Sequence, residues 1–452
     1  MEMKLKLYAT LLIGLIIFGC QKEDDLDRLA ELSFDRPAAI GGRTLAGYQD
    51  GALYVKGQEN SIPNLIFEQV EQYGGTTFNV NKMNASGSVG VGINPKPWTS
   101  IFQTKSSLGM RTDCNGDVSL GPVKELYTTT DLPDFDNSSA MVNNQNQCIP
   151  FAKMNDLNDP NFGLSYSNGN NFPYYHRKAE NPGASTMLSE LVDYNPSFLI
   201  AWLGMEDIYS YALDGGYGHT IPSPADFETK LDSILAIMNA NGTKGVLANI
   251  PSIEDLPYFN LIPYNNANLT QDQADQLNTF YSAAGANHIS FSEGPNPFVM
   301  EDPDAPNGLR QIMQGEYLTL TVPLDSMRCF LYGLQGKYMI DRYVLSLTEV
   351  SEVNSAIISY NQIIADLADK YDFALFDANS FYHNMKSGMK WNGVDYSFEF
   401  VSGGFIGLDG VYPNQKGHEL LANEMIRAIN AKYGSAIPNV NCFDCDGSIF
   451  PE

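Results

Sequence analysis

The residues with the clearest potential for chemistry lie in three short segments that also contain glycine. Residues 41–54 read Gly-Gly-Arg-Thr-Leu-Ala-Gly-Tyr-Gln-Asp-Gly-Ala-Leu-Tyr, residues 204–207 read Gly-Met-Glu-Asp, and residues 408–414 read Leu-Asp-Gly-Val-Tyr-Pro-Asn. Thr44 carries a hydroxyl that could attack an acyl carbon, although threonine usually needs an adjacent base to do so. Its neighbour Arg43 is a permanent cation and cannot act as a nucleophile.

The second and third segments supply two carboxylates and a phenol. A serine-type hydrolase needs a nucleophile, a base, an acid that orients the base, and hydrogen-bond donors for the oxyanion. Asp409 could orient a base, but Tyr412, with an ordinary phenol pKa of about 10, is a poor base near neutral pH. Glu206 is an acceptor when ionised and would repel an oxyanion. The second and third segments therefore supply an acid but neither an effective base nor an oxyanion donor.

The segments at residues 41–54 and 408–414 resemble the SGNH/GDSL hydrolase family, in particular its Bacteroidetes lipoprotein branch. That family reads Gly-(Asp or Gly)-Ser-Leu-Thr-Ala-Gly at the first segment and Asp-Gly-Val-His at the second. Alignment on Ala46 and Gly47 places Arg43 at the position of the family's serine. The same resemblance places Tyr412 at the position of its histidine.

The resemblance also assigns the middle segment, which is similar to the family's Gly-Asn-Asn-Asp block. Gly204 is then retained, Glu206 replaces the asparagine that donates to the oxyanion, and Asp409 keeps the family's acid. The resemblance implies a hydrolase scaffold with degenerate catalytic positions at Arg43, Gly204, Glu206, Asp409 and Tyr412. In the family fold these positions converge at the tips of adjacent strands, so we expect Arg43 to pair with Glu206 or Asp409.

A second alignment keeps an active enzyme open. With a one-residue deletion, Thr44 takes the place of the serine and the chain becomes an esterase or deacetylase that uses a threonine nucleophile. The histidine nearest to Tyr412 in the sequence is His418, which we expect to face solvent or to cap the last helix.

The N-terminus has the features of a lipoprotein signal. Lys4 and Lys6 precede an apolar stretch at residues 7–18 that is too short to span a membrane. The stretch ends in Ile-Phe-Gly-Cys and so resembles a bacterial lipobox, which implies a lipid anchor on Cys20. A plain secretory signal is the alternative.

The segment after Cys20 reads Gln-Lys-Glu-Asp-Asp and resembles the acidic export signal of Bacteroidetes surface lipoproteins. It implies an outer-membrane protein, lipid-anchored and facing the cell exterior; a solvated charged linker is the alternative. We therefore predict a signal peptide at residues 1–19 and a lipidated linker at residues 20–35.

Composition limits the partners. The chain has 452 residues, a formal net charge of −26 and 43% hydrophobic residues, so it can bury a substantial core. So acidic a chain lacks the cationic face that nucleic acid or anionic lipid requires, and no nucleic-acid partner is expected. We predict no cofactor and no metal, because the cysteines and histidines show no zinc-ligand spacing.

Cysteine usage suits an exported protein. Apart from Cys20 the chain has five cysteines, and proximity in the sequence favours two disulfides. The predicted pairs are Cys114–Cys148 and Cys442–Cys445, and the sequence gives no role to Cys329.

Short apolar runs alternate with amphipathic helices. The predicted strands cover residues 38–40, 198–203, 246–250 and 373–376, and the predicted helices begin near Ser61, Ser223 and Thr348 or contain residues 420–429. This alternation predicts an α/β fold, a doubly wound parallel sheet with helices on both faces; the family resemblance makes it a flavodoxin-like SGNH hydrolase fold. The predicted domain spans residues 36–437, with large insertions at 76–190 and 252–347 and a tail at 438–452.

Three functions are compatible with these features. The first is a catalytically inactive surface lipoprotein that serves as a binding or assembly subunit, beside an outer-membrane β-barrel protein. The second is an active esterase or deacetylase. The third is a lipoprotein whose old pocket binds a glycan or a lipid fragment.

Overall fold

A five-stranded parallel sheet forms the centre of the protein. The computed structural model describes residues 32–72, 74–84, 89–93, 102–127, 133–164 and 173–441. Across the sheet the strands follow the order β6 (Asn146–Cys148), β1 (Pro37–Gly41), β7 (Phe198–Trp202), β8 (Lys244–Ala248) and β15 (Ala374–Phe376), and all neighbours are parallel. In chain order this is 2-1-3-4-5, the order of flavodoxin-like folds. The predicted α/β class with a parallel sheet is confirmed.

The central strands form where the sequence has continuous apolar runs. All five residues of β1 and of β7 are buried, as expected for strands that are covered on both faces. The four strands that the apolar runs predict are present, with ends shifted by no more than two residues; β8, for example, covers Lys244–Ala248.

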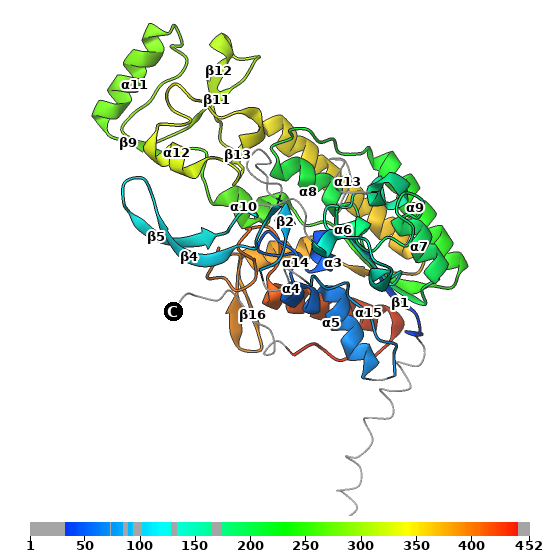
Figure 1. Ribbon diagram of the computed structural model, residues 1–452. Helices are drawn as coiled ribbons and strands as arrows, with labels where there is room; N and C mark the ends of the chain where they lie inside the picture. The colour runs from blue at the N-terminus through cyan, green and yellow to red at the C-terminus, as the bar shows by residue number, and fades with distance from the viewer. Residues whose placement is uncertain are drawn as a thin grey trace, which may run out of the picture.

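Helices cover both faces of the sheet (Figure 1). On one face α5 (Ile62–Glu71) packs against α15 (Gln415–Tyr433), and on the other α13 (Leu347–Lys370) packs against α8 (Met205–Leu213) and α9 (Pro224–Ala240). The predicted start of α9 is confirmed, since the Ser223 side chain accepts a hydrogen bond from the Asp226 amide. α13 begins slightly earlier than predicted, because Ser346 and Glu349 form a capping box ahead of Thr348.

Part of the stretch that was predicted as an insertion at 76–190 belongs to the central sheet. Its strand β6 pairs with β1, with Gln147 opposite Ile40. The strand was not predicted because Asn-Gln-Cys has no apolar pattern. The Gln147 side chain is hydrogen-bonded instead to a buried ion pair of Lys178 and Glu190. Lys178 donates to Gln147 Oε1 at 2.7 Å, and Glu190 accepts from Gln147 Nε2 at 3.0 Å.

The same stretch contains several smaller elements. They are β2 (Gly92–Ile93), β3 (Phe102–Gln103), the hairpin of β4 (Ser107–Thr112) and β5 (Val118–Val123), α6 (Pro173–His176) and α7 (Met187–Tyr194). In Figure 1 the β4–β5 hairpin extends from the body of the protein as a ribbon.

The stretch from 252 to 347 has a hydrophobic cluster of its own. Its buried residues come from Ile262 to Val344 and include Tyr281, Val299 and Met339. The elements around this cluster are β9 (Ala267–Leu269), α11 (Gln271–Ala283), β10 (Gly294–Asn296), β11 (Val299–Glu301), β12 (Leu309–Gln311), β13 (Tyr317–Leu318), α12 (Leu324–Cys329) and β14 (Val344–Leu345). α10 (Pro257–Asn260), which precedes them, packs into the main core through Tyr258 and Phe259. Figure 1 shows α11, β11, β12 and α12 away from the sheet and its helices.

The remaining elements lie close to the strand ends. They are α3 (Arg43–Ala46), α4 (Val55–Glu59), α14 (Ala378–Lys386) and the hairpin of β16 (Met389–Trp391) and β17 (Val394–Tyr396). No helix in the described ranges is both long enough and apolar enough to cross a membrane. The predicted signal peptide, Cys20, Cys442 and Cys445 lie outside the described residues.

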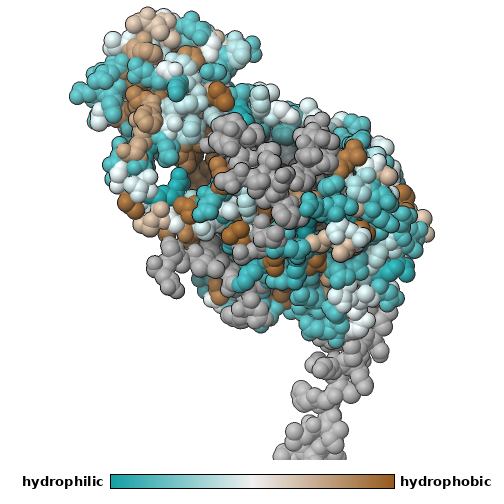
Figure 2. All heavy atoms as spheres, viewed as in Figure 1, coloured by the Kyte–Doolittle hydropathy of each residue, from teal (hydrophilic) through white to brown (hydrophobic). Residues whose placement is uncertain are grey.

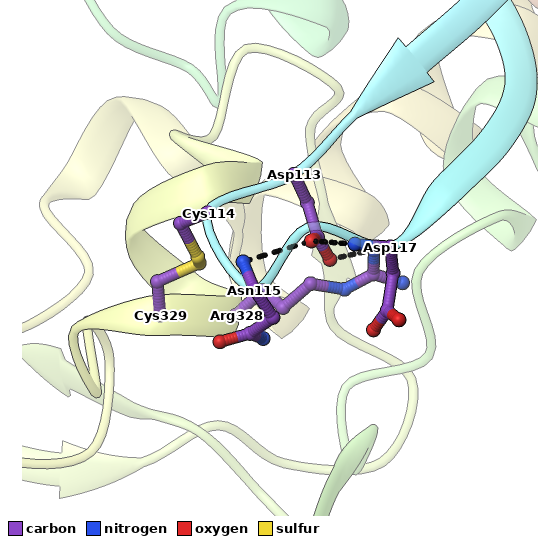
Figure 3. The surroundings of a disulfide bond; sticks show 6 residues. All are labelled: Asp113, Cys114, Asn115, Asp117, Arg328 and Cys329. Atoms are coloured by element: carbon purple, nitrogen blue, oxygen red, sulfur yellow. Dashed lines mark hydrogen bonds and ion pairs between the residues drawn. A yellow bond between two sulfur atoms is a disulfide. The ribbon is translucent and has the colours of Figure 1, made fainter.

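The disulfide in the described part of the chain differs from the predicted one. Cys114, at the tip of the β4–β5 hairpin, is bonded to Cys329 at the end of α12 (Figure 3). Cys148 is instead a free, buried thiol. The predicted Cys114–Cys148 pair is therefore wrong. Proximity in the sequence favoured it, but the fold places Cys148 in the central sheet and carries Cys114 away on the hairpin. Connectivity of this kind depends on the fold and cannot be deduced from spacing.

Candidate functional site

Two neighbouring strands bring the first and second segments together. Arg43 begins α3 directly after β1, and Glu206 lies in the first turn of α8 directly after β7. Because β1 and β7 are parallel neighbours, both helices start at the same edge of the sheet. This carboxyl edge is where α/β proteins of this class place their ligand sites.

Arg43 and Glu206 form a buried ion pair at this edge. Glu206 accepts a hydrogen bond from Arg43 Nε at 2.9 Å, its Oε2 also lies 2.6 Å from Arg43 Nη2 as an ion-pair contact, and the side chains of both residues are less than 10% exposed. The backbone amide of Arg43 also donates to Glu206 Oε1 at 2.6 Å. The predicted pairing of Arg43 is confirmed with Glu206 as the partner, while Asp409 has other partners.

The surroundings favour a charged Arg43. Burial by itself opposes the charge, but the Glu206 carboxylate and the neighbouring tyrosines together outweigh it and raise the pKa of Arg43 above its usual value. Glu206 sits in the first turn of α8, where the helix dipole favours a negative charge. The guanidinium is therefore a fixed cation that contacts Glu206 through hydrogen bonds from Nε and an ion-pair contact at Nη2.

Two glycines make room for this arrangement. A Cβ atom on Gly42 would lie 2.3 Å from both Cγ and Oε1 of Glu206, so the glutamate occupies space that only a glycine leaves free. Gly204 precedes α8 with a φ of +86°, and a Cβ there would lie 2.6 Å from the Phe227 ring. Glycine at Gly204 is thus needed for the turn that aims Glu206 at Arg43.

Aromatic rings enclose the guanidinium. Arg43 Cζ lies 4.3 Å from the centroid of the Phe151 ring and 4.7 Å from that of the Tyr412 ring. Tyr48 packs edge-on against both rings, at centroid distances of 5.5 and 5.9 Å. Cation–π contacts of this kind are strongest when the cation is desolvated, as it is here. The space at the strand tips is filled by protein side chains.

Tyr412 is unsuited to accept a proton. Its side chain is 3% exposed, and burial raises its pKa well above that of a free phenol. Its hydroxyl has no hydrogen-bond partner within the described residues. The structure therefore places Tyr412 as a wall of the Arg43 enclosure.

Asp409 holds two loops together. Its Oδ1 accepts from the amides of Val411 and Tyr412 at 2.8 Å, and its Oδ2 accepts from the Gly51 amide at 3.0 Å. Asp50 makes a second hydrogen bond between the same two loops, since its Oδ1 accepts from the Leu408 amide at 2.8 Å. These hydrogen bonds hold residues 408–412 against residues 50 and 51.

The contacts between these two loops involve two partly buried carboxylates, Asp50 and Asp409. Burial and the nearby charge of Asp50 raise the pKa of Asp409 to about 6, although the three amide hydrogen bonds act in the opposite direction. Burial also raises the pKa of Asp50, which accepts a further hydrogen bond from the Tyr54 hydroxyl at 3.0 Å.

The threonine alternative finds little support in the geometry. Thr44 lies within α3 and is 2% exposed. His418, which was expected to face solvent, is fully buried in α15, and this burial lowers its pKa to about 3. An effective general base has a pKa near the working pH, so an imidazole in this environment is a weak base. The expected exposure of His418 was wrong because the first turn of α15 packs inward.

Sequence reasoning missed Phe151 and Asp50. Phe151 lies just beyond β6 with a φ of +68°, a conformation that is rare for a bulky residue and that no sequence signal indicated. Asp50 stands in the first segment beside Gly51, and no signal in the sequence indicated its partner 358 residues away.

A polar groove lies elsewhere on the molecule. It has a volume of about 820 Å³ and is lined by parts of α4, α5 and α15, by residues 78–82 and by residues 439–441. None of the residues at the motif positions lines it.

Comparisons with known proteins yield distant structural likenesses. No protein-family model and no curated protein sequence matches the chain. The chain is similar to a lipase/acylhydrolase from Enterococcus faecalis, with 11% identity over 64% of this chain and 75% of that one and a TM-score of 0.26. It is also similar to a GDSL-like lipase from Parabacteroides merdae, with 10% identity over 88% of this chain and 96% of that one and a TM-score of 0.33.

Proposed function

We propose that this protein is a catalytically inactive SGNH-type hydrolase that acts as a binding or assembly subunit on the outer-membrane surface, beside a β-barrel protein. The observation that carries the proposal is the buried Arg43–Glu206 ion pair at the carboxyl edge of the sheet. A fold can keep its shape while its site loses its original chemistry.

Three features of the ion pair oppose acyl transfer. Arg43 cannot be a nucleophile, and Glu206 places a negative charge where an oxyanion would develop. The resemblance also assigns an oxyanion contact to the backbone amide at position 43, and that amide is bonded to Glu206 at 2.6 Å. The donors that would stabilise the transition state are therefore missing or already occupied.

The aromatic rings around Arg43 also disfavour a ligand at the place where the resemblance puts the family's catalytic site. Phe151 and Tyr412 both lie against the guanidinium, with Tyr412 buried and Phe151 partly buried. A glycan or lipid fragment would have to displace these rings and expose a buried charge. A binding role is better served by the surfaces of the long segments that leave the sheet.

Hydrolysis of p-nitrophenyl acetate by the purified chain tests the loss of activity. We expect no turnover above the rate in buffer from the natural protein, and none from Arg43→Ser alone, because catalytic groups act as a unit. The triple change of Arg43→Ser, Glu206→Asn and Tyr412→His restores all three family residues and is the variant most able to recover turnover.

Thr44→Ala is the matched control for the threonine alternative. If the natural protein hydrolyses the ester and Thr44→Ala abolishes this activity, the chain is a threonine esterase and the proposal is wrong. Thermal unfolding of each variant distinguishes a lost activity from a lost fold.

The proposed location and partner have tests of their own. The lipobox-like sequence that ends at Cys20 and the acidic residues after it support a lipid anchor and a location on the cell exterior. Protease added to intact cells should degrade the protein, and full protection would place it on the periplasmic side. Purification from detergent-treated membranes should recover a β-barrel protein in stoichiometric amount if the assembly role is correct.

A further inference from the structure

The β4–β5 hairpin presents an apolar face to solvent. Its register places Met110 opposite Leu120 and Thr112 opposite Val118. Since alternate residues of a strand point to the same side, Met110, Leu120 and Val118 share one face of the ribbon. These side chains are 64%, 44% and 59% exposed. Contiguous exposed apolar side chains are typical of interaction surfaces.

The disulfide adds a second element to this face. Cys114 at the hairpin tip is bonded to Cys329 in α12, and Asp113 beside it accepts from Arg328 at 2.7 Å (Figure 3). The residues that follow Cys329 are Phe330, which is 69% exposed, and Leu331, which is 43% exposed with a φ of +54°. A leucine in the left-handed region is strained, as side chains at functional surfaces often are.

We call Met110, Leu120, Val118, Phe330 and Leu331 the docking face. Figure 2 shows hydrophobic residues among hydrophilic ones on the side of the molecule where Figure 1 places β4, β5 and α12. The two parts of the docking face are 215 residues apart in the chain, and the disulfide holds them beside each other.

The charge around the docking face differs from that of the whole chain. Residues 102–127 and 323–340 together contain five basic and four acidic side chains, whereas the chain has 27 basic and 53 acidic residues. β4 and the residues just before it contain Lys105 and Arg111 and no acidic residue. Lys105 lies at the base of the hairpin, over the Tyr54 ring, so Arg111 near the hairpin tip is the one charged side chain along β4 itself.

The hairpin also has an open edge. Within the described residues β4 and β5 pair only with each other, so the outer edge of each strand carries unpaired backbone groups. β5 contains Pro122, which has no N–H to donate, while β4 contains no proline. The edge of β4 is thus the better template for a further strand.

We propose that the edge of β4 binds an extended segment of another protein as a third strand. The segment alternates apolar and acidic residues, so that its apolar side chains cover Met110 and its acidic side chains meet Arg111 on the opposite face of the ribbon. The inference rests on the proposed binding role and names the kind of partner that it involves.

Charge disfavours the other possible occupants. A second copy of the chain would bring a further net charge of −26, which opposes association of two copies. An anionic bilayer would repel the same negative charge. A separate protein with an acidic, apolar strand meets neither objection.

Photocrosslinking in the cells that naturally produce the protein tests the proposal. A benzoylphenylalanine is placed at Met110 or at Phe330, and the matched control places it at Ile358, a 72% exposed residue of α13. We expect the first two positions to crosslink to the same second protein, at a segment whose sequence alternates apolar and acidic residues. The control position should give no such product.

Arg111→Glu provides the second measurement. Because it reverses the charge that faces the incoming strand, it should reduce crosslinking from Phe330 about tenfold while thermal unfolding stays unchanged. The proposal is wrong if the crosslinked partner is a second copy of the chain, a lipid or a helical segment. It is also wrong if Ile358 crosslinks as well as Met110 and Phe330 do, or if none of the three positions crosslinks. Ester hydrolysis by the same preparations separates the two ideas, since turnover contradicts the proposed function, whereas inactivity without crosslinks contradicts only this inference.

Discussion

Replacing Glu206 by glutamine tests whether the stability contributions of Arg43 and Glu206, at the carboxyl edge of the sheet, depend on each other. Glutamine keeps nearly the same shape but removes the negative charge and puts an NH2 group where one carboxylate oxygen accepts from Arg43. The glutamate oxygens accept hydrogen bonds from the Arg43 amide at 2.6 Å and from Nε at 2.9 Å and lie 2.6 Å from Nη2, and the Glu206 side chain is only 3% exposed. Breaking a buried pair by removing one partner costs about 3–5 kcal/mol, because the other charge stays buried.

The double replacement gives the opposite expectation. Changing Glu206 to leucine and Arg43 to methionine removes both charges, and methionine retains contact with the Phe151 and Tyr412 rings. Replacing a buried pair by apolar residues of similar volume is often neutral or stabilising. We therefore expect the double variant to be more stable than Glu206→Gln or Arg43→Met alone.

Urea unfolding followed by circular dichroism measures these differences. Asp395→Asn is the control, since Asp395 pairs with Lys390 at 3.3 Å but is 80% exposed and should leave the transition in place. If Glu206→Gln shifts the transition no more than this control does, the charges at the strand tips are not effectively buried. If the double variant loses the sum of the two single losses, the groups act independently and the ion-pair reasoning fails.

Three further predictions concern other features of the molecule. Because the folded-state pKa of Asp409 is raised to about 6 from 3.8, the folded state holds its proton more tightly, and its contribution to stability should fall as pH rises from about 4 to about 6. Asp409→Asn should flatten this fall, by up to ~3 kcal/mol, in unfolding curves across this pH range; an equal slope in both proteins would contradict the raised pKa. Gly42→Ala should destabilise the protein by about 1–3 kcal/mol through its clash with Glu206, whereas Gly121→Ala, whose Cβ meets only Arg111 at 3.4 Å, should not; equal losses in calorimetry would show that the clash relaxes. Cys114→Ser should free the hairpin tip, so that trypsin cleaves after Arg111 at a dilution that spares the natural protein, and unchanged cleavage would mean that the disulfide does not restrain β4.

The sequence predicted the parts of the fold whose apolar pattern is strong. β1 and β7 are continuous buried runs, and α9 begins at a serine cap followed by apolar residues at helical spacing. The polar strand β6 was missed, because Gln147 is stabilised by Lys178 and Glu190, which lie far along the chain. Hydrophobic periodicity reports burial by apolar neighbours and not burial by hydrogen-bond partners.

The site was predictable where the strand order alone determines proximity. Arg43 and Glu206 each follow a strand, so a parallel β1–β7 pair was enough to bring them together. The enclosure was not predictable in the same way, because Phe151 reaches Arg43 through a turn with an unusual backbone conformation. His418 and the cysteine pairing failed for a related reason, since burial and long-range contacts belong to the whole fold.

The position of β6 limits how this protein can be shortened, in evolution or in the laboratory. The strand enters the sheet beside β1 more than 100 residues after β1 ends, so the chain between them is anchored in the core at both ends. Between the two strands, α3 and α5 belong to the core, whereas most residues of the β4–β5 hairpin are exposed. A deletion within the hairpin shortens a surface segment, at an entropic difference that depends only weakly on length. A deletion of Asn146–Cys148 uncovers the edge of β1 and invites pairing with other chains. Natural variants of this protein should therefore differ freely in the length of the hairpin while keeping those three residues.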